Sequence, residues 1–159
     1  MIIHELTRNE CEHFLKQMSF GRLACAQDNQ PYVVPIYFAF DGSYVYCFST
    51  VGQKIEWMRS NPLVCLEVDD VVDHLHWTSV VGLGRYEELC DVPACVNSRQ
   101  HALDWLQRRP MWWQPAYVAT EHRHSPRLLI PVFYRIRIDE LTGHRGMPDA
   151  VEKASANEF

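Results

Sequence analysis

Five residues between positions 49 and 54 have the types and spacing of an anion-binding site: Ser49, Thr50, Gly52, Gln53 and Lys54. Two hydroxyl groups and a glycine follow an apolar run, and a lysine stands where a helical pattern opens. The start of a helix offers unpaired N–H groups and the positive end of the helix dipole, and Lys54 adds a full charge. The segment therefore predicts a phosphate site. Spacing alone favours a second interpretation, because a hydroxyl residue before a helix more often serves only as its cap.

A second glycine motif, Gly82-Leu83-Gly84-Arg85, shares its first part with the dinucleotide fingerprint. The third glycine is absent, and the motif lies within a strand pattern rather than between a strand and a helix. We therefore expect no Rossmann-type site here. The two glycines instead indicate a bulge or a close backbone approach.

Two His-x-His pairs raise the question of a metal site: His74 with His76, and His122 with His124. In an extended segment this spacing places both rings on one face. No carboxylate or cysteine stands at a convincing ligand spacing, and both pairs fall near expected loops. A solvated surface is the favoured interpretation, and we predict no metal ion.

The aromatic pair Trp112 and Trp113 has two interpretations that the sequence leaves equal. A rigid aromatic face could cover a planar ligand, or the pair could form a core or dimer contact. Elsewhere no nucleophile with a neighbouring base stands out, and no carboxylate pair stands out as a catalytic pair. Hydrolysis and acyl transfer therefore have no positive support, and no catalytic side chain can be named.

Short β-rich runs must position these residues. Thr7 and Glu10 form a capping-box pattern at the start of a first helix. Turn residues Asp28-Asn29-Gln30-Pro31 and the hairpin signal Asp41-Gly42 separate the first three runs. We expect strands at 21–27, 32–40, 44–49, 63–68, 76–89 and 128–138, helices at 7–18, 54–60 and 93–108, an irregular segment at 109–127 and an aperiodic, disordered tail after Leu141.

Strands that follow one another through tight turns favour an antiparallel barrel with α additions over a doubly wound sheet. The fold class predicted is mainly β, and 159 residues suit one domain. A net charge of −5 without a basic run argues against nucleic acid as a partner. No signal-peptide pattern or membrane-length apolar stretch occurs, so we expect a cytoplasmic protein without a membrane partner. The six cysteines form no C-x-x-C pair and suit reduced core positions.

The order of three segments carries a resemblance to a known family: GRLACAQDNQPYVVPIYFAFDGSYVYCFSTVGQKIEWMRSNPLVCLEV, then SVVGLGRYEEL, then YRIRIDELTGHR. It resembles the flavin-nucleotide-binding branch of the pyridoxamine-phosphate-oxidase-like split barrels, which includes nitroimidazole-reductase-type proteins. The resemblance covers residues 5–145. It implies an FMN-binding split-barrel domain over residues 1–145 and a polar tail over 146–159.

The resemblance also implies a homodimer with FMN at its interface. The phosphate would contact Ser49, Thr50, Gln53 and Lys54. The ring would lie along one strand, with a second group on the adjacent strand and Phe48 beside the phosphate residues. These ring residues are Val34, Pro35, Ile36 and Tyr37, then Thr78, Ser79 and Val80.

Three departures from the family pattern limit the predicted reaction. Gln53 stands where relatives often carry a second basic residue, and Phe48 replaces a histidine common in this branch. The chain ends in RIRIDELTGHR rather than in the motif that holds the vitamin substrate, so pyridoxamine-phosphate oxidation is not expected. The resemblance implies an FMN-dependent oxidoreductase that passes electrons from a reduced donor to a small nitroaromatic- or quinone-like acceptor. The alternative is a non-catalytic flavin- or haem-binding module for storage or sensing.

Overall fold

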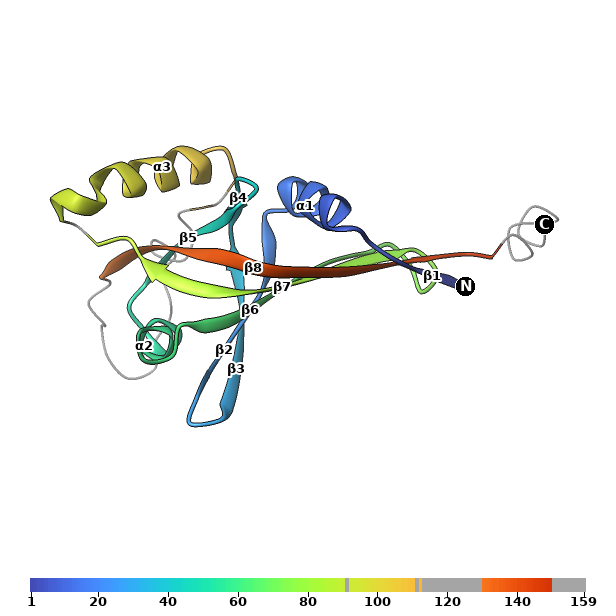
Figure 1. Ribbon diagram of the computed structural model, residues 1–159, viewed down its shortest axis with the longest axis horizontal. Helices are drawn as coiled ribbons and strands as arrows, with labels where there is room; N and C mark the ends of the chain where they lie inside the picture. The colour runs from blue at the N-terminus through green and yellow to red at the C-terminus, as the bar shows by residue number, and fades with distance from the viewer. Residues whose placement is uncertain (91, 111, 113–129, 150–159) are drawn as a thin grey trace.

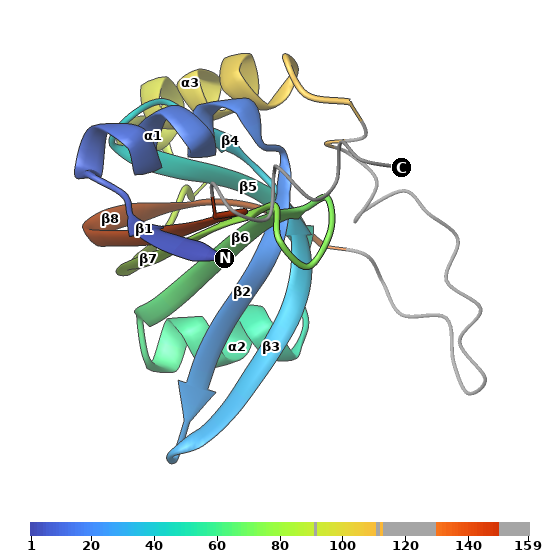
Figure 2. The ribbon, with the colours of Figure 1, turned by 90° about the vertical axis from the view of Figure 1, so that its right-hand side faces the viewer.

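One antiparallel sheet organises the fold. The computed structural model describes residues 1–90, 92–110, 112 and 130–149. Within them the sheet order is β3-β2-β6-β7-β8-β5-β4, and β1 pairs with the end of β8 (Figure 1). The sheet curls into an open, split barrel (Figure 2), so the expected fold class is confirmed. The strands are β1 (Ile2–Glu5), β2 (Phe20–Gln27), β3 (Gln30–Tyr37), β4 (Ala39–Phe40), β5 (Tyr44–Thr50), β6 (Leu63–Val71), β7 (Trp77–Glu88) and β8 (Pro131–Met147).

Helices cover the barrel from two sides. Helices α1 (Arg8–Gln17) and α3 (Val96–Leu106) lie on one side, and α2 (Gln53–Ser60) lies on the other (Figures 1 and 2). The predicted capping box of α1 is confirmed, because the backbone N–H of Thr7 donates to Glu10 Oε2 at 2.8 Å and the Thr7 hydroxyl caps the Glu10 N–H. The expected helix at 93–108 is shorter, since a 3₁₀ turn (Pro93–Cys95) precedes α3.

Two tight hairpins fix the register of the first strands. Asp28 and Asn29 both have positive φ, 51° and 63°, as a two-residue turn between β2 and β3 requires. In the β4–β5 hairpin, Asp41 N donates to Tyr44 O at 3.2 Å. The loop residues are therefore Gly42, with φ of 111°, and Ser43, one position later than the predicted Asp41-Gly42.

The sequence prediction was wrong in three places. The expected strand 32–40 is divided into β3 and the two-residue β4. The last strand, expected at 128–138, continues to Met147, so residues 142–147 are not a disordered tail. Strand β1 was not predicted. Most of the segment 109–127 and the end of the tail, 150–159, lie outside the described residues.

Strand β5 separates two apolar clusters. Val45 and Cys47 point into the barrel interior, while Tyr46 and Phe48 point to the opposite side and pack beneath α3. This alternation is the ordinary consequence of a strand buried on both faces. The predicted bulge is confirmed as a register shift between Leu83 and Gly84.

Candidate functional site

The centre of the candidate site is a contact between the end of β5 and the first turn of α2. The Lys54 ammonium donates to Ser49 Oγ at 2.6 Å. Ser49 is buried and its hydroxyl also contacts the carbonyl oxygen of Thr50 at 3.3 Å. Among the described residues no carboxylate lies within ion-pair distance of Lys54. The ammonium group is therefore hydrogen-bonded to a neutral hydroxyl, and no side-chain carboxylate neutralises its charge.

The start of α2 carries no side-chain cap. Gly52 occupies the N-cap position in extended conformation, and no side chain there accepts a hydrogen bond from the first turn. A methyl group built on Gly52 would meet no atom within 4 Å, so the approach to the free N–H groups is open. The cap interpretation, which spacing alone favoured, is therefore wrong for Ser49 and Thr50. The arrangement can instead receive an anion.

Burial shapes the electrostatics of this lysine. Removal from water lowers the pKa of Lys54, and Coulombic attraction to Cys47 and Cys25, which requires their ionised thiolates, opposes that shift only in part. Burial likewise raises the pKa of the Cys47 thiol to about 12, so this sulfur is a neutral neighbour. An anion placed beside Lys54 would compensate for the lost hydration of the ammonium group.

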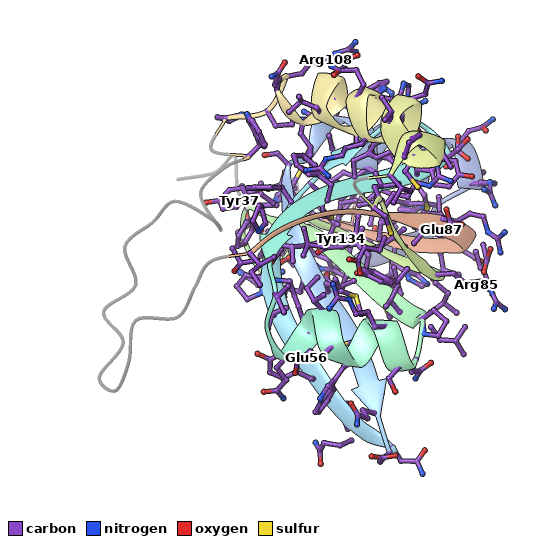
Figure 3. The ribbon with its side chains drawn as sticks, turned by 90° about the vertical axis from the view of Figure 1, so that its left-hand side faces the viewer. Tyr37, Glu56, Arg85, Glu87, Arg108 and Tyr134 are labelled. Atoms are coloured by element: carbon purple, nitrogen blue, oxygen red, sulfur yellow. The ribbon has the colours of Figure 1, made fainter. Side chains whose placement is uncertain are left out.

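A buried hydroxyl lies on the barrel side of the same region. Tyr134 stands opposite Cys47 in the β5–β8 pairing, and its side chain lies between the sheet and α2 (Figure 3). Its hydroxyl is buried and has no hydrogen-bond partner among the described residues. Strand alternation through Val132, Tyr134 and Ile136 could have identified this inward position. The lack of a partner for its oxygen has no sequence signal.

The first group of predicted ring residues lies on β3, which reaches α2. Tyr32 of β3 packs against Trp57 of α2 with ring centroids 5.5 Å apart. Val34 is half-buried on the same side, while Ile36 is buried in the core. On the other face, Pro35 is exposed and Tyr37 is half-buried. β3 has one strand partner, β2, and therefore forms an edge of the sheet.

The second group, Thr78, Ser79 and Val80, does not lie on an adjacent strand, and the prediction is corrected here. β2 and β6 stand between β3 and β7. The sequence suggested adjacency because strand order is a long-range property that local patterns do not encode. Thr78 accepts a hydrogen bond from Arg145, Ser79 donates to Glu67 at 3.1 Å, and Val80 is fully buried.

The remaining predicted residues separate into exposed and packed positions. Gln53 is exposed at the start of α2, and Thr50 is half-buried at the end of β5. Phe48 faces away from Ser49, with its ring 4.6 Å from Phe133 and 5.5 Å from Trp112. Trp112 thus takes part in packing beneath α3, and its neighbour in the sequence, Trp113, lies outside the described residues.

The histidine pairs give no metal cluster in the part of the chain that the structure describes. His76 Nδ1 lies 2.9 Å from a carboxylate oxygen of Asp73, and His74 is exposed. His122 and His124 lie outside the described residues. Over the described ranges, no helix has the length and apolar character needed to cross a membrane.

Comparison with known proteins identifies the family of this chain. A family model for pyridoxamine 5′-phosphate oxidase matches residues 7–145. The chain belongs to this family. An uncharacterised protein from Rhizobium meliloti (strain 1021) is 39% identical over 143 residues, which are 90% of this chain and 95% of that protein.

Two solved structures extend the comparison. A FAD-binding protein from Mesorhizobium loti is 40% identical, with a TM-score of 0.74, over 93% of this chain and 99% of that one. A candidate 5-nitroimidazole antibiotic resistance protein from Bacteroides thetaiotaomicron has 21% identity and a TM-score of 0.63, over 91% of this chain and 89% of that one. The latter shares the fold.

Proposed function

We propose that this protein binds a flavin nucleotide and that Ser49, Thr50, Gln53 and Lys54 hold its phosphate. The observation that carries the proposal is the Lys54 ammonium, partly buried beside the uncapped start of α2 and without a carboxylate partner among the described residues. A phosphate at this position would accept charge-assisted hydrogen bonds from Lys54 and bonds from the free N–H groups of the first turn.

The nucleotide could be FMN or FAD, since both carry a phosphate on the ribityl chain. The sequence resemblance favours FMN, and the FAD-binding relative from Mesorhizobium loti favours FAD. The proposed phosphate contacts are the same for both. Gln53 is exposed and uncharged, so Lys54 supplies the side-chain charge at this turn.

We also propose that two copies of the chain enclose the flavin. The outer face of β2, β3, β6 and β7 exposes the apolar residues Phe20, Val33, Leu63 and Leu83, at 43%, 58%, 55% and 47%. Such a surface fits an interface better than bulk water. Arg22 pairs with Glu67 and Asp69 on the same face, which gives it a polar centre.

A dimer would also bring together the two groups of predicted ring residues, which lie on strands that are not adjacent within one chain. Within one chain two strands, β2 and β6, separate Thr78 and Ser79 from the first group, which is Val34, Pro35, Ile36 and Tyr37. A second copy could present its own β7 to the β3 edge of the first. Val80 and Ile36 could contribute through the backbone only, because their side chains are buried in the core.

The reaction proposed is electron transfer from a reduced donor to a small nitroaromatic- or quinone-like acceptor. A bound flavin supplies this redox chemistry, while the protein binds and orients it and excludes water. Because the flavin would supply the chemistry, the reaction needs no catalytic nucleophile with a neighbouring general base, and none stands out in the sequence. Storage or sensing of flavin is the non-catalytic alternative.

The phosphate assignment is tested by titrating flavin-free protein with FMN and with riboflavin, which lacks the phosphate. Lys54→Ala should weaken FMN binding by about 1.5–3 kcal/mol, roughly 10- to 100-fold, and leave riboflavin binding unchanged. Lys16→Ala, at an exposed lysine of α1, is the matched control. Equal FMN affinities in the two variants would refute the assignment.

Cofactor identity and activity need a second experiment. Protein purified without added flavin should show flavin absorbance, and chromatography of the released cofactor distinguishes FMN from FAD. A Soret band without flavin would instead identify haem and overturn the proposal. Anaerobic addition of NADH or NADPH should bleach the flavin if the protein is a reductase, whereas a stable spectrum with both donors favours the binding module.

A further inference from the structure

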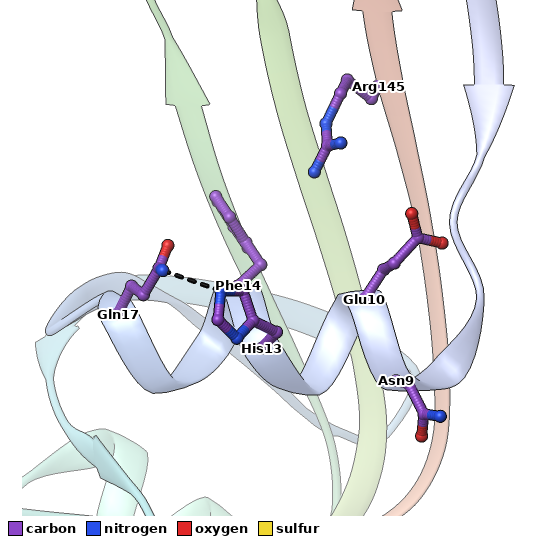
Figure 4. Close-up of a pocket in the computed structure, with 6 residues that line it drawn as sticks. All are labelled: Asn9, Glu10, His13, Phe14, Gln17 and Arg145. Atoms are coloured by element: carbon purple, nitrogen blue, oxygen red, sulfur yellow. Dashed lines mark hydrogen bonds between the residues drawn. The ribbon is translucent and has the colours of Figure 1, made fainter.

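A hollow of about 320 Å³ lies between α1 and the end of β8, away from Ser49 and Lys54. Its lining combines a guanidinium, an imidazole, side-chain amides, a carboxylate and an aromatic ring (Figure 4). The lining residues are Asn9, Glu10, His13, Phe14, Gln17 and Arg145. This volume is at the lower end of small-molecule sites, so it suits a compact ligand.

Arg145 is the unusual residue of this hollow. Its Nε donates to the Thr78 hydroxyl at 3.3 Å, and no carboxylate of the described residues lies within ion-pair distance of it. Other arginines have such partners, including Arg135 with Glu87 and Arg59 with Glu88. Arg145 is only partly exposed, and it lines the hollow.

The opposite wall offers further polar groups over an apolar surface. His13 and Gln17 are joined at 2.9 Å on the exposed side of α1, and Phe14 is buried behind them. In Figure 4 the Arg145 side chain reaches over α1 from β8 toward Phe14 and His13, while Asn9 points away. A planar ligand could therefore rest near the Phe14 ring with its charged end at Arg145.

Glu10 sets a limit on the charge of such a ligand. Its carboxylate reaches toward Arg145 but is engaged by the Thr7 backbone N–H at 2.8 Å and the Thr7 hydroxyl at 2.7 Å. These bonds lower the pKa of Glu10, so it remains negative near neutral pH. A second negative charge in the hollow would be repelled.

We propose that this hollow binds a small organic monocarboxylate, whose carboxylate pairs with the Arg145 guanidinium and whose apolar part rests near Phe14. A guanidinium presents two parallel N–H donors that match the two oxygens of a carboxylate. The hollow lies away from the proposed phosphate residues Ser49 and Lys54, although Arg145 contacts Thr78, one of the proposed ring residues.

Benzoate serves as the probe, and binding is followed by calorimetry and by amide chemical shifts of α1 in the full chain. Benzoate should bind saturably and shift the α1 amides. Benzamide, its neutral counterpart, should bind about tenfold or more weakly. Equal binding of the two compounds, or no saturable response to benzoate, would overturn the proposal.

Variants on the same strand locate the site. Arg145→Gln should reduce benzoate affinity about tenfold or more, whereas Arg137→Gln should not, because Arg137 already pairs with Asp139. If Arg145→Gln does not fold, His13→Ala and Gln17→Ala on the exposed side of α1 give the same test through smaller losses. Lys54→Ala should leave benzoate binding unchanged. Equal losses in the Arg145 and Arg137 variants, or no loss in any variant of the hollow, would contradict the assignment.

Discussion

The rings of Tyr86 and Tyr134 lie 5.3 Å apart in the barrel interior, yet their hydroxyl groups differ in their partners. Tyr86 donates to Glu88 Oε2 at 2.7 Å, and Glu88 also accepts two bonds from Arg59. The Tyr134 hydroxyl has no partner among the described residues, and the Cys47 thiol beside it is a weak hydrogen-bonding group. Neighbouring tyrosines therefore contribute to stability in different ways.

Replacement of each tyrosine by phenylalanine should separate the two contributions. Tyr86→Phe removes a hydrogen bond to a charged group and should lower the free energy of unfolding by about 1.5–3 kcal/mol. Tyr134→Phe removes a buried hydroxyl without a partner and should leave stability unchanged or increase it. Urea unfolding of both variants measures the difference. Equal destabilisation would contradict the assignment of an unpartnered Tyr134 hydroxyl.

The pH dependence of stability should report the buried ammonium of Lys54. Because burial lowers its pKa below the ordinary 10.5, the unfolded chain binds more protons than the folded one between the two values. The contribution of Lys54 to stability therefore rises with pH through that window.

Lys54→Met removes this contribution and is the comparison for the same pH series. The raised pKa values of the buried thiols and phenols act in the opposite direction at alkaline pH, but they are common to both proteins. The difference in unfolding free energy between wild type and variant should change with pH. A constant difference would show that the lysine titrates normally.

Alkylation should distinguish the cysteines by burial. All six are free thiols, and Cys90 is the exposed one. Iodoacetamide should modify Cys90 first, whereas Cys11, Cys25 and Cys47 should react only after unfolding, because burial raises the pKa of each of these thiols. Peptide mass spectrometry over time measures the order, and denatured protein is the control in which all six react. Early labelling of Cys47 in the folded protein would contradict the placement of its side chain.

The bulge between β7 and β8 should not accept a side chain at Gly84. A methyl group there would contact the carbonyl oxygen of Arg137 and lie 2.8 Å from Ile136 Cγ2. Gly84→Ala should therefore destabilise the protein by about 1–3 kcal/mol. Leu83→Ala, at a neighbouring side chain that is 47% exposed, is the control. Thermal unfolding that gives the two variants the same midpoint would contradict the close approach at the bulge.

The sequence predicted local features well because they depend on nearby residues. The Thr7–Glu10 capping box, the Asp28-Asn29 turn and the bulge next to Gly84 each follow from side chains or glycines within a few positions. The end of β8 was missed because two of its buried positions, one on each face of the strand, are glycines. Gly143 faces Leu6, Cys11 and Val80, and Gly146 faces Trp77, so other segments supply the apolar groups that the alternation lacks.

The site was predictable in part. Ser49 and Lys54 meet because the strand, the turn and the helix that carry them are consecutive. The relation of Val34 to Thr78 was not predictable, because it depends on β2 and β6 lying between their strands. The flavin contacts along these strands stay predictions. Arg145 was also missed, since its hollow joins residues from opposite ends of the chain.

The position of β8 in the sheet has a consequence for synthesis. It is the last strand in the described sequence, yet it pairs with β1, β5 and β7. As the nascent chain leaves the ribosome, the strands that pair with β8 have open edges until that final segment emerges. Open edges can pair with another chain, and contacts between distant segments form slowly. The arrival of β8 therefore covers the open edges of β5 and β7 and removes these two sites of association with neighbouring chains.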